Sequence, residues 1–131
     1  MPQSQRRSDE GSAVAEFTLV SSLLSLVFVS LLQLGLAMHV RNTVVDSAIA
    51  GARIAAAADR TPEDGAAHTA DLIGAAVSES YARDITVSEG SGPSGRMLTV
   101  TVRIPVPVFG LLGPVGGWEL TGRALAEDPQ L

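Results

Sequence analysis

The strongest pattern in this chain is an uninterrupted apolar stretch near its N-terminus. From Phe17 to Met38 there are 22 residues without a charged side chain. About 20 apolar residues in a helix that rises about 1.5 Å per residue cross a hydrocarbon core about 30 Å thick. The pattern therefore predicts a transmembrane helix, which we assign to residues 12–38.

A helical period continues beyond this stretch, with no proline to end it. Val40, Val44 and Ala48, followed by Ala52 or Ala55, form an apolar stripe. Charged residues stand on the opposite side, which is typical of a helix lying on a small domain. We therefore expect the helix to continue through residues 39–58 as a stalk. The charged residues opposite the stripe are Arg41, Asp46 and Arg53.

Residues 59–131 predict a small extracytoplasmic domain that begins with a second helix. Thr61 is a suitable N-cap, Pro62 fits the first helical position, and Glu63 and Asp64 place acids in the first turn. We expect this helix to run to about Tyr81. Its predicted apolar side consists of Ala66, Ala70, Ile73, Val77 and Tyr81.

Alternating apolar and polar residues follow and predict strands. Ile85 and Val87 mark a short first strand, and a turn over residues 89–95 leads to the second. A third strand from Trp118 to Ala126 returns beside the second. The predicted fold class is α+β, with a long N-terminal helix, a second helix and an antiparallel sheet of about three strands. In the second strand Leu98, Val100, Val102 and Ile104 alternate with Thr99, Thr101 and Arg103.

A cleaved secretory signal peptide is the main alternative for the apolar stretch. Its hydrophobic region would be about 7 to 15 residues long, shorter than the stretch here, and the nearest Ala-x-Ala after the stretch, at Ala48, lies well past its end. Arg6 and Arg7 could suggest a twin-arginine signal, but the polar and acidic residues 8–10 follow them. Both alternatives fit less well than a permanent span.

Polar residues recur along one side of the predicted span. Small and hydroxylated side chains let helices approach closely in lipid and form hydrogen bonds between them. This side is therefore a candidate helix-packing face. The alternative is that each hydroxyl bonds to a carbonyl of its own helix. The face comprises Ser22, Ser25, Ser30 and Gln33.

The residues just before the span carry the most specific signal. Glu16 places a carboxylate at the start of an apolar helix, where an acid at mid-bilayer would cost about 2.5 to 3.5 kcal/mol. If the chain were cut after Gly11, the new amine of Ser12 would stand one helical turn from Glu16 and could pair with it. The alternative is an acid favoured by the helix macrodipole, worth about 0.3 to 1 kcal/mol.

This junction, Gly11 followed by four small or apolar residues and then Glu16-Phe17, resembles that of the TadE/TadF-like family, the type IV pilin-like pseudopilins of the tight-adherence (Flp pilus) system. The resemblance implies that a prepilin peptidase removes a leader, residues 1–11, and that Glu16 neutralises an N-terminal amine during assembly. Ser12 departs from the bulky apolar residue that often follows the cut in pilins. Gly51-Ala52-Arg53 also resembles the family's Ala-rich stretch.

The amino-acid composition argues against several classes of function. Aromatic residues make up only 4% of the chain, and the net charge of -5 comes without a basic patch, so neither a ligand pocket nor nucleic-acid binding is expected. There is no Cys, and His39 and His68 lack ligand partners at metal-binding spacing. We therefore expect no enzyme, no cofactor and no metal site.

The segment from Pro105 to Gly117 is rich in proline and glycine and is expected to be an apolar loop. Exposed apolar patches mark contacts with partners or membranes, so the loop is a candidate partner surface. The alternative is that its side chains only close the end of a thin core. The candidate residues are Val108, Phe109, Leu111 and Leu112.

Together these features predict a single-pass membrane protein with a cytoplasmic N-terminus and an extracytoplasmic C-terminal domain. The positive-inside rule favours this orientation slightly, through Arg6 and Arg7, and the family resemblance supports it. The predicted role is a minor pilin or pseudopilin in a tight-adherence pilus or related secretion apparatus. Its expected partners are membrane lipid, prepilin peptidase, other pilin subunits and the inner-membrane assembly platform, with homo- or hetero-oligomers formed through the N-terminal helix. The alternative is an anchored module that scaffolds or regulates another envelope complex.

Overall fold

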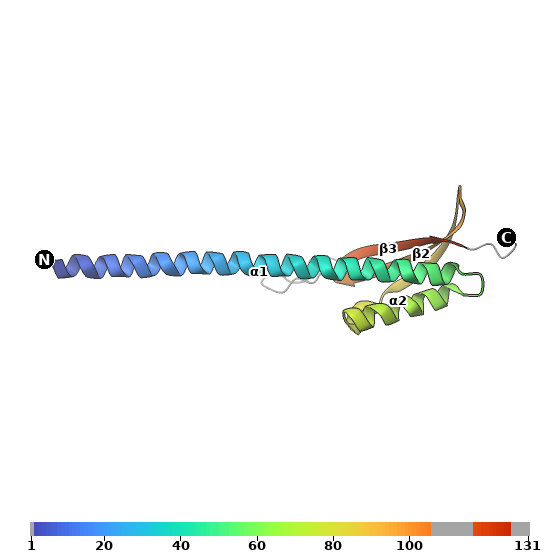
Figure 1. Ribbon diagram of the computed structural model, residues 1–131, viewed down its shortest axis with the longest axis horizontal. Coiled ribbons are helices and arrows are strands. Elements are labelled where there is room, and N and C mark those ends of the chain that lie inside the picture. Colours follow the sequence, from blue (N-terminus) through green and yellow to red (C-terminus); the bar gives the residue numbers. More distant parts are fainter. Residues whose placement is uncertain (1, 106–116, 127–131) are drawn as a thin grey trace. The chain divides into compact units, whose positions relative to one another are not determined.

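The computed structural model describes residues 2–105 and 117–126. These residues form two helices, a short 3₁₀ turn and a three-stranded antiparallel sheet, so the predicted α+β class is confirmed (Figure 1). The chain divides into two compact units, Met1–Gly35 and Leu36–Leu131.

The first unit consists of helix α1, which runs from Pro2 to Ala56 and so continues into the second unit. By length and composition α1 is apolar enough to cross a membrane. Every Val, Leu, Phe and Met from Val14 to Met38 is exposed, and Phe17 reaches 73%. A surface of this kind is stable only where lipid or other protein covers it.

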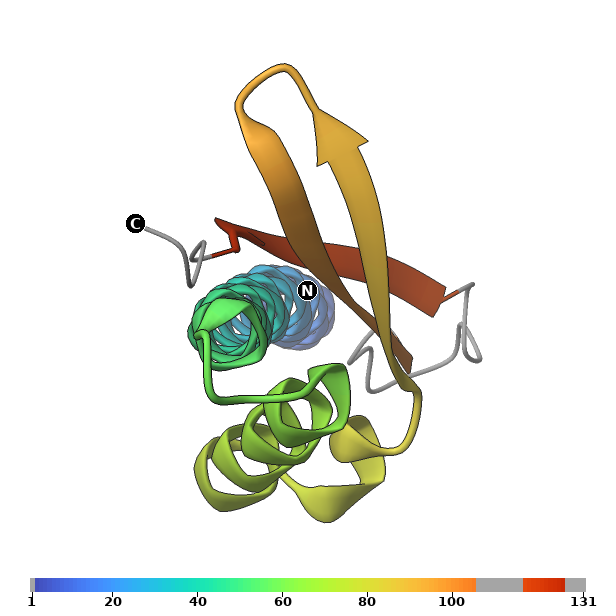
Figure 2. The same ribbon diagram turned by 90° about the vertical axis from the view of Figure 1, so that its right-hand side faces the viewer.

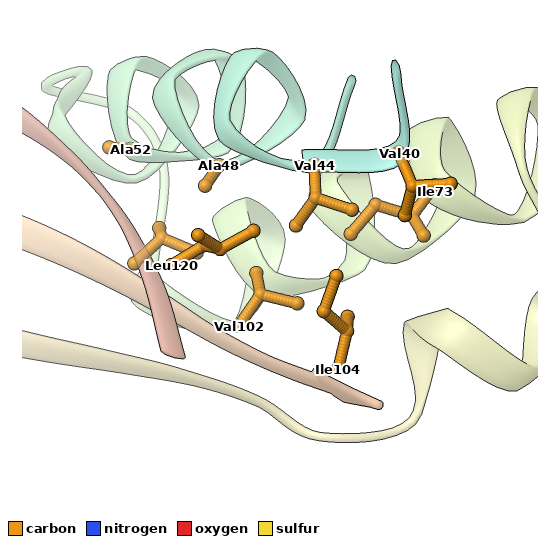
Figure 3. Packing of buried hydrophobic residues seen from close by; sticks show 9 residues of the cluster. Val40, Val44, Ala48, Ala52, Ile73, Val102, Ile104 and Leu120 are labelled. Carbon is orange, nitrogen blue, oxygen red and sulfur yellow. The ribbon is translucent and has the colours of Figure 1, made fainter. Parts of the chain in front are cut away.

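The second unit begins at Leu36 and packs the last part of α1 against the sheet. All positions of the predicted apolar stripe are buried, and both Ala52 and Ala55 belong to it. In Figure 2 this part of α1 lies between α2 and the strands. Figure 3 shows the packed side chains. The cluster contains Val40, Val44, Ala48, Ala52, Ile73, Val100, Val102, Ile104 and Leu120.

Helix α2 runs from Pro62 to Ala76, and its predicted start is confirmed. The Thr61 hydroxyl accepts a hydrogen bond from the Asp64 backbone N–H at 3.2 Å, and the Thr61 N–H donates to Asp64 Oδ2 at 2.9 Å. This reciprocal pair is a capping box. The bond from the Thr61 backbone holds the pKa of Asp64 below its ordinary value of 3.8.

The expected continuation of α2 to Tyr81 is wrong. The Val77 N–H bonds to the Ile73 carbonyl at 2.9 Å, and the helix ends there. Ser78 then caps a separate 3₁₀ turn, η1 (Glu79–Ala82), by accepting a bond from the Ser80 N–H. A serine side chain that bonds to nearby backbone competes with helix continuation, which explains the early end.

The sheet is a meander of β1 (Ile85–Gly92), β2 (Gly95–Pro105) and β3 (Gly117–Leu125), in the order β1-β2-β3. The predicted alternation in β2 is confirmed, because Leu98, Val100, Val102 and Ile104 are buried. The predicted third strand is confirmed as well, with Trp118 opposite Ile104 and Ala124 opposite Leu98.

The predicted seven-residue turn at residues 89–95 is wrong. Strand β1 continues to Gly92, and only Pro93 and Ser94 form the turn. Gly95 adopts φ +117°, a backbone conformation that side-chain-bearing residues rarely take. Strand pairing uses backbone groups, so the small residues at 90–92 pair without needing side chains to pack. A salt bridge of 2.8 Å between Arg96 and Glu89 spans the two strands.

Candidate functional site

The junction residues lie on an unbroken stretch of α1. Gly11, Ser12, Glu16 and Phe17 are all helical and exposed. Ser12 and Glu16 are four residues apart, so they stand one turn from each other on the same side of the helix. Among the described residues no salt bridge involves Glu16. A helix of this form presents the carboxylate to its surroundings, where a positive group on the same chain or a neighbouring subunit could pair with it.

The candidate helix-packing face lies on the same unit. Ser22 Oγ donates to the Thr18 carbonyl at 2.7 Å, and Ser30 Oγ donates to the Leu26 carbonyl at 2.7 Å. These two hydroxyls therefore bond within their own helix. Such bonds remove the cost of placing a hydroxyl in lipid while leaving a small side chain on the surface. A shallow hollow follows this side of the helix, lined by Phe17, Thr18, Ser21, Ser22, Ser25, Leu26 and Val29. Contact between this face and another helix stays a prediction.

The candidate partner loop, with Val108, Phe109, Leu111 and Leu112, lies outside the described residues. The described residues on either side of it, Pro105 and Gly117, are paired across β2 and β3. The proposed partner contact stays a prediction.

Sequence reasoning missed a close crossing of α1 and α2. A side chain at Gly51 would collide with Thr69 Oγ1 and would lie 2.7 Å from the Gly65 carbonyl oxygen. A side chain at Gly65 would lie 2.6 Å from the Gly51 carbonyl oxygen and 2.5 Å from Ala55 Cβ. Gly51 belongs to the Gly51-Ala52-Arg53 sequence, and its role is to let the helix backbones touch.

A second close approach joins α1 to strand β3. A side chain at Gly122 would collide with the backbone at Ile49 and would lie 2.7 Å from the Ala48 carbonyl oxygen. Gly122 stands between the inward-facing residues Leu120 and Ala124. The glycine therefore lets α1 rest directly on the strand. Only the isolated glycine within an alternating strand could have suggested this contact.

The polar side chains that the structure describes in the second unit do not converge on a metal site. Within residues 2–105 and 117–126, no group of three or more His, Asp or Glu side chains could hold a metal ion. Arg60, Asp64, His68 and Asp71 surround an open hollow beside Ile54. The hollow carries charges of both signs and gives no argument for one ligand class. The expectations of no cofactor and no enzyme activity stay predictions.

Comparison with known families gives a match over part of the chain. Residues 11–53 match the model of a family described as TadE-like protein. The matched region begins at Gly11, includes Glu16 and Phe17 and the whole apolar stretch, and ends at Arg53, just after the α1–α2 crossing glycine. No curated protein and no solved structure matches the chain.

Proposed function

We propose that this chain, which matches the TadE-like family model over residues 11–53, is a membrane-anchored minor pilin or pseudopilin of the tight-adherence pilus system. The observation that carries the proposal is the start of the family match at Gly11. The match therefore contains the whole Gly11-x4-Glu16-Phe17 junction and leaves residues 1–10 outside it. The start of the match lies within one residue of the cut expected after Gly11, between a leader and a mature subunit.

The surface of α1 supports membrane anchoring. The large apolar side chains from Val14 to Met38 are exposed, and none of them is buried by another part of residues 2–105 and 117–126. A bilayer would cover them in full, and a bundle of like helices would cover them in an assembled fibre. We place the N-terminus in the cytoplasm and the second unit outside it. The proposal assigns no catalysis to the chain.

In this proposal Glu16 is the residue that distinguishes an assembly subunit from a plain anchor. After cleavage behind Gly11, the Ser12 amine would lie one turn from the Glu16 carboxylate, in the same subunit or in a neighbour. An ion pair removes much of the cost of a carboxylate in or near lipid. Prepilin peptidase, other pilin subunits and the inner-membrane assembly platform are the proposed partners.

The first experiment is mass spectrometry of the mature chain from cells with an active prepilin peptidase. We expect an N-terminus at Ser12, and an intact Met1 would refute the processing step. The second experiment replaces Glu16 by Ala and measures the chain in sheared surface fibres and in the membrane fraction. We expect loss from the fibres with the membrane fraction retained.

The matched control is Glu10→Ala, which removes an acid from the leader that is discarded. This chain should assemble like the wild type. If Glu16→Ala assembles equally well, the chain is better explained by the alternative, an anchored module that scaffolds or regulates another envelope complex. That alternative has no need for a carboxylate at the start of the span.

A further inference from the structure

One end of the second unit lies close in sequence to the end of the apolar stretch. Val40 is the first buried residue of the α1 stripe, only two residues after Met38. It belongs to the same cluster as Ile73, near the C-terminal end of α2, and Ile104, near the end of β2. In Figure 3 these three side chains lie together, away from Ala52. We call this the Val40 end of the unit.

The only Tyr and the only Trp of the chain both lie at the Val40 end. Tyr81 is in η1, which follows α2, and Trp118 is in the first part of β3, opposite Ile104. Both are half-buried and pack against the cluster that contains Val40. Tyr and Trp are enriched where proteins meet the headgroup layer, because each has an apolar ring and a polar group.

The distance along α1 from Met38 to Val40 indicates how close the Val40 end lies to the hydrocarbon core of the bilayer. Two residues of helix advance about 3 Å, and the headgroup layer on each side of the hydrocarbon core is about 5 to 7 Å thick. If the hydrocarbon ends at Met38, Val40 is still at headgroup level. Helix α1 is continuous through Met38 and Val40.

Charged groups at the Val40 end are compatible with lipid headgroups of zero net charge. Arg41 and Arg83 are exposed and form no salt bridge among the described residues. Arg103 is paired with Glu119 at 3.1 Å. Glu79 and Asp84 stand on the neighbouring turn, so the charges nearly balance. Headgroups that carry both phosphate and a cationic group match such a surface better than a strongly anionic layer does.

We propose that the base of the second unit, defined as Arg41, Tyr81, Arg83 and Trp118, docks on the headgroup layer of the bilayer that α1 crosses. Tyr81 and Trp118 are the interfacial anchors, and the two arginines reach lipid phosphates. The inference rests on the membrane insertion in the proposed function and requires neither cleavage at Gly11 nor a pilus. Docking would hold the small domain at the membrane surface until a partner displaces it.

Trp118 is also a unique fluorescent probe, so the wild-type chain can be tested directly. The full chain is reconstituted into phosphatidylcholine vesicles that contain lipid with a nitroxide on the headgroup or in the middle of the acyl chain. The headgroup nitroxide should quench Trp118 more strongly than the acyl-chain nitroxide does. Trp118 should also be shielded from acrylamide in the water.

Two further single-tryptophan chains serve as controls. Trp118→Phe with Leu125→Trp moves the probe to the far end of β3, about 23 Å away at about 3.3 Å per residue. Leu125 is 52% exposed, so the site accepts a large side chain. Trp118→Phe with Phe28→Trp places the probe in the middle of the apolar stretch, where the acyl-chain nitroxide should quench it best.

The expected result is headgroup quenching at least about two-fold stronger for the wild type than for the Leu125→Trp chain, as for an interfacial aromatic. Equal, weak quenching of these two chains would overturn the docking proposal. If the Phe28→Trp probe is then still quenched from the acyl chains, membrane insertion survives. Trp118 shielded from acrylamide but not quenched by either lipid would show that protein covers the base, which also overturns the proposal. An unquenched Phe28→Trp probe would overturn membrane insertion and docking together.

Discussion

The two parts of helix α1 have the same backbone and opposite surfaces. From Val14 to Leu34 the large apolar side chains are Leu, Val and Phe, and all of them are exposed. From Val40 to Ala56 a stripe of Val and Ala is buried, with Gly51 at the closest crossing. The first surface suits lipid chains, which accept large apolar side chains in any direction. The second suits protein, since helices and strands can approach its backbone only where side chains are small.

The two parts of α1 can also be compared through the hydrogen bond that one serine hydroxyl makes in each. Ser30 in the first part and Ser47 in the second each donate to the carbonyl four residues earlier, at 2.7 and 2.8 Å. Ser30 is exposed, whereas Ser47 is 5% exposed. The hydroxyl is satisfied by its own helix in both places, so the bond itself does not identify the environment. The large side chains next to each serine identify the environment, lipid or protein.

The largest contrast should come from truncating one large side chain in each part. Ile73 is fully buried against α1. Ile73→Ala should lower the unfolding free energy of the second unit by about 2–5 kcal/mol, because the smaller side chain leaves a cavity that the surrounding residues do not refill. Leu26, which is 65% exposed, should change the unfolding free energy of the second unit by less than about 0.5 kcal/mol when replaced by Ala. Urea titration of the full chain in detergent micelles, followed by Trp118 fluorescence, measures both. Equal losses would contradict the division into two independent surfaces.

A smaller contrast concerns the close approach of α1 to β3. Gly122→Ala places a methyl group against the backbone at Ala48 and Ile49, and should cost about 1–3 kcal/mol. The control is Gly90→Ala in strand β1, where no described residue other than the chain neighbours of Gly90 has an atom within 4 Å of the added carbon. That change should leave stability as it is or raise it by up to about 1 kcal/mol, because alanine has less freedom in the unfolded chain. The same urea titration distinguishes them, and a tolerated Gly122→Ala would show that α1 can move away from the strand.

Sequence patterns predicted the parts of this fold that depend on local period. The stripe from Val40 to Ala52 and the alternation in β2 follow from side-chain spacing alone. The end of α2 and the two-residue hairpin at Pro93 were predicted wrongly, since short-range side-chain bonds and backbone pairing decided them. Burial of Thr69 was also missed, because it follows from the crossing with Gly51, which no period encodes.

The candidate functional residues also fall into a group that the sequence could identify and a group that it could not. The residues from Gly11 to Phe17 are adjacent in the chain, so a motif could identify them, and the family match covers them. The base was not predicted, because Tyr81 and Trp118 are far apart in sequence and belong to different elements. Only the packing of η1 and β3 around the same cluster brings them to one end.

The smallest expected effect concerns the α2 capping box, which closes the second unit at the end away from Val40. Thr61→Ala removes the hydroxyl that accepts from the Asp64 N–H and should cost about 0.5–2 kcal/mol. Thr61→Ser keeps that oxygen and is the matched control, with stability expected close to the wild type.

The capping box also gives the second unit a pH dependence with a defined sign. The pKa of Asp64 is lowered in the folded state by the Thr61 N–H, so the unfolded state binds the proton more readily. The stabilisation is therefore complete above the ordinary value of 3.8 and is lost as the pH falls through the lower, folded pKa. Asp64→Asn should flatten this loss in thermal unfolding of the full chain at acid pH, while Thr61→Ser should retain it. If Asp64→Asn loses as much stability at acid pH as the wild type does, other carboxylates cause the pH dependence. The cap would then contribute to stability through its hydrogen bonds alone.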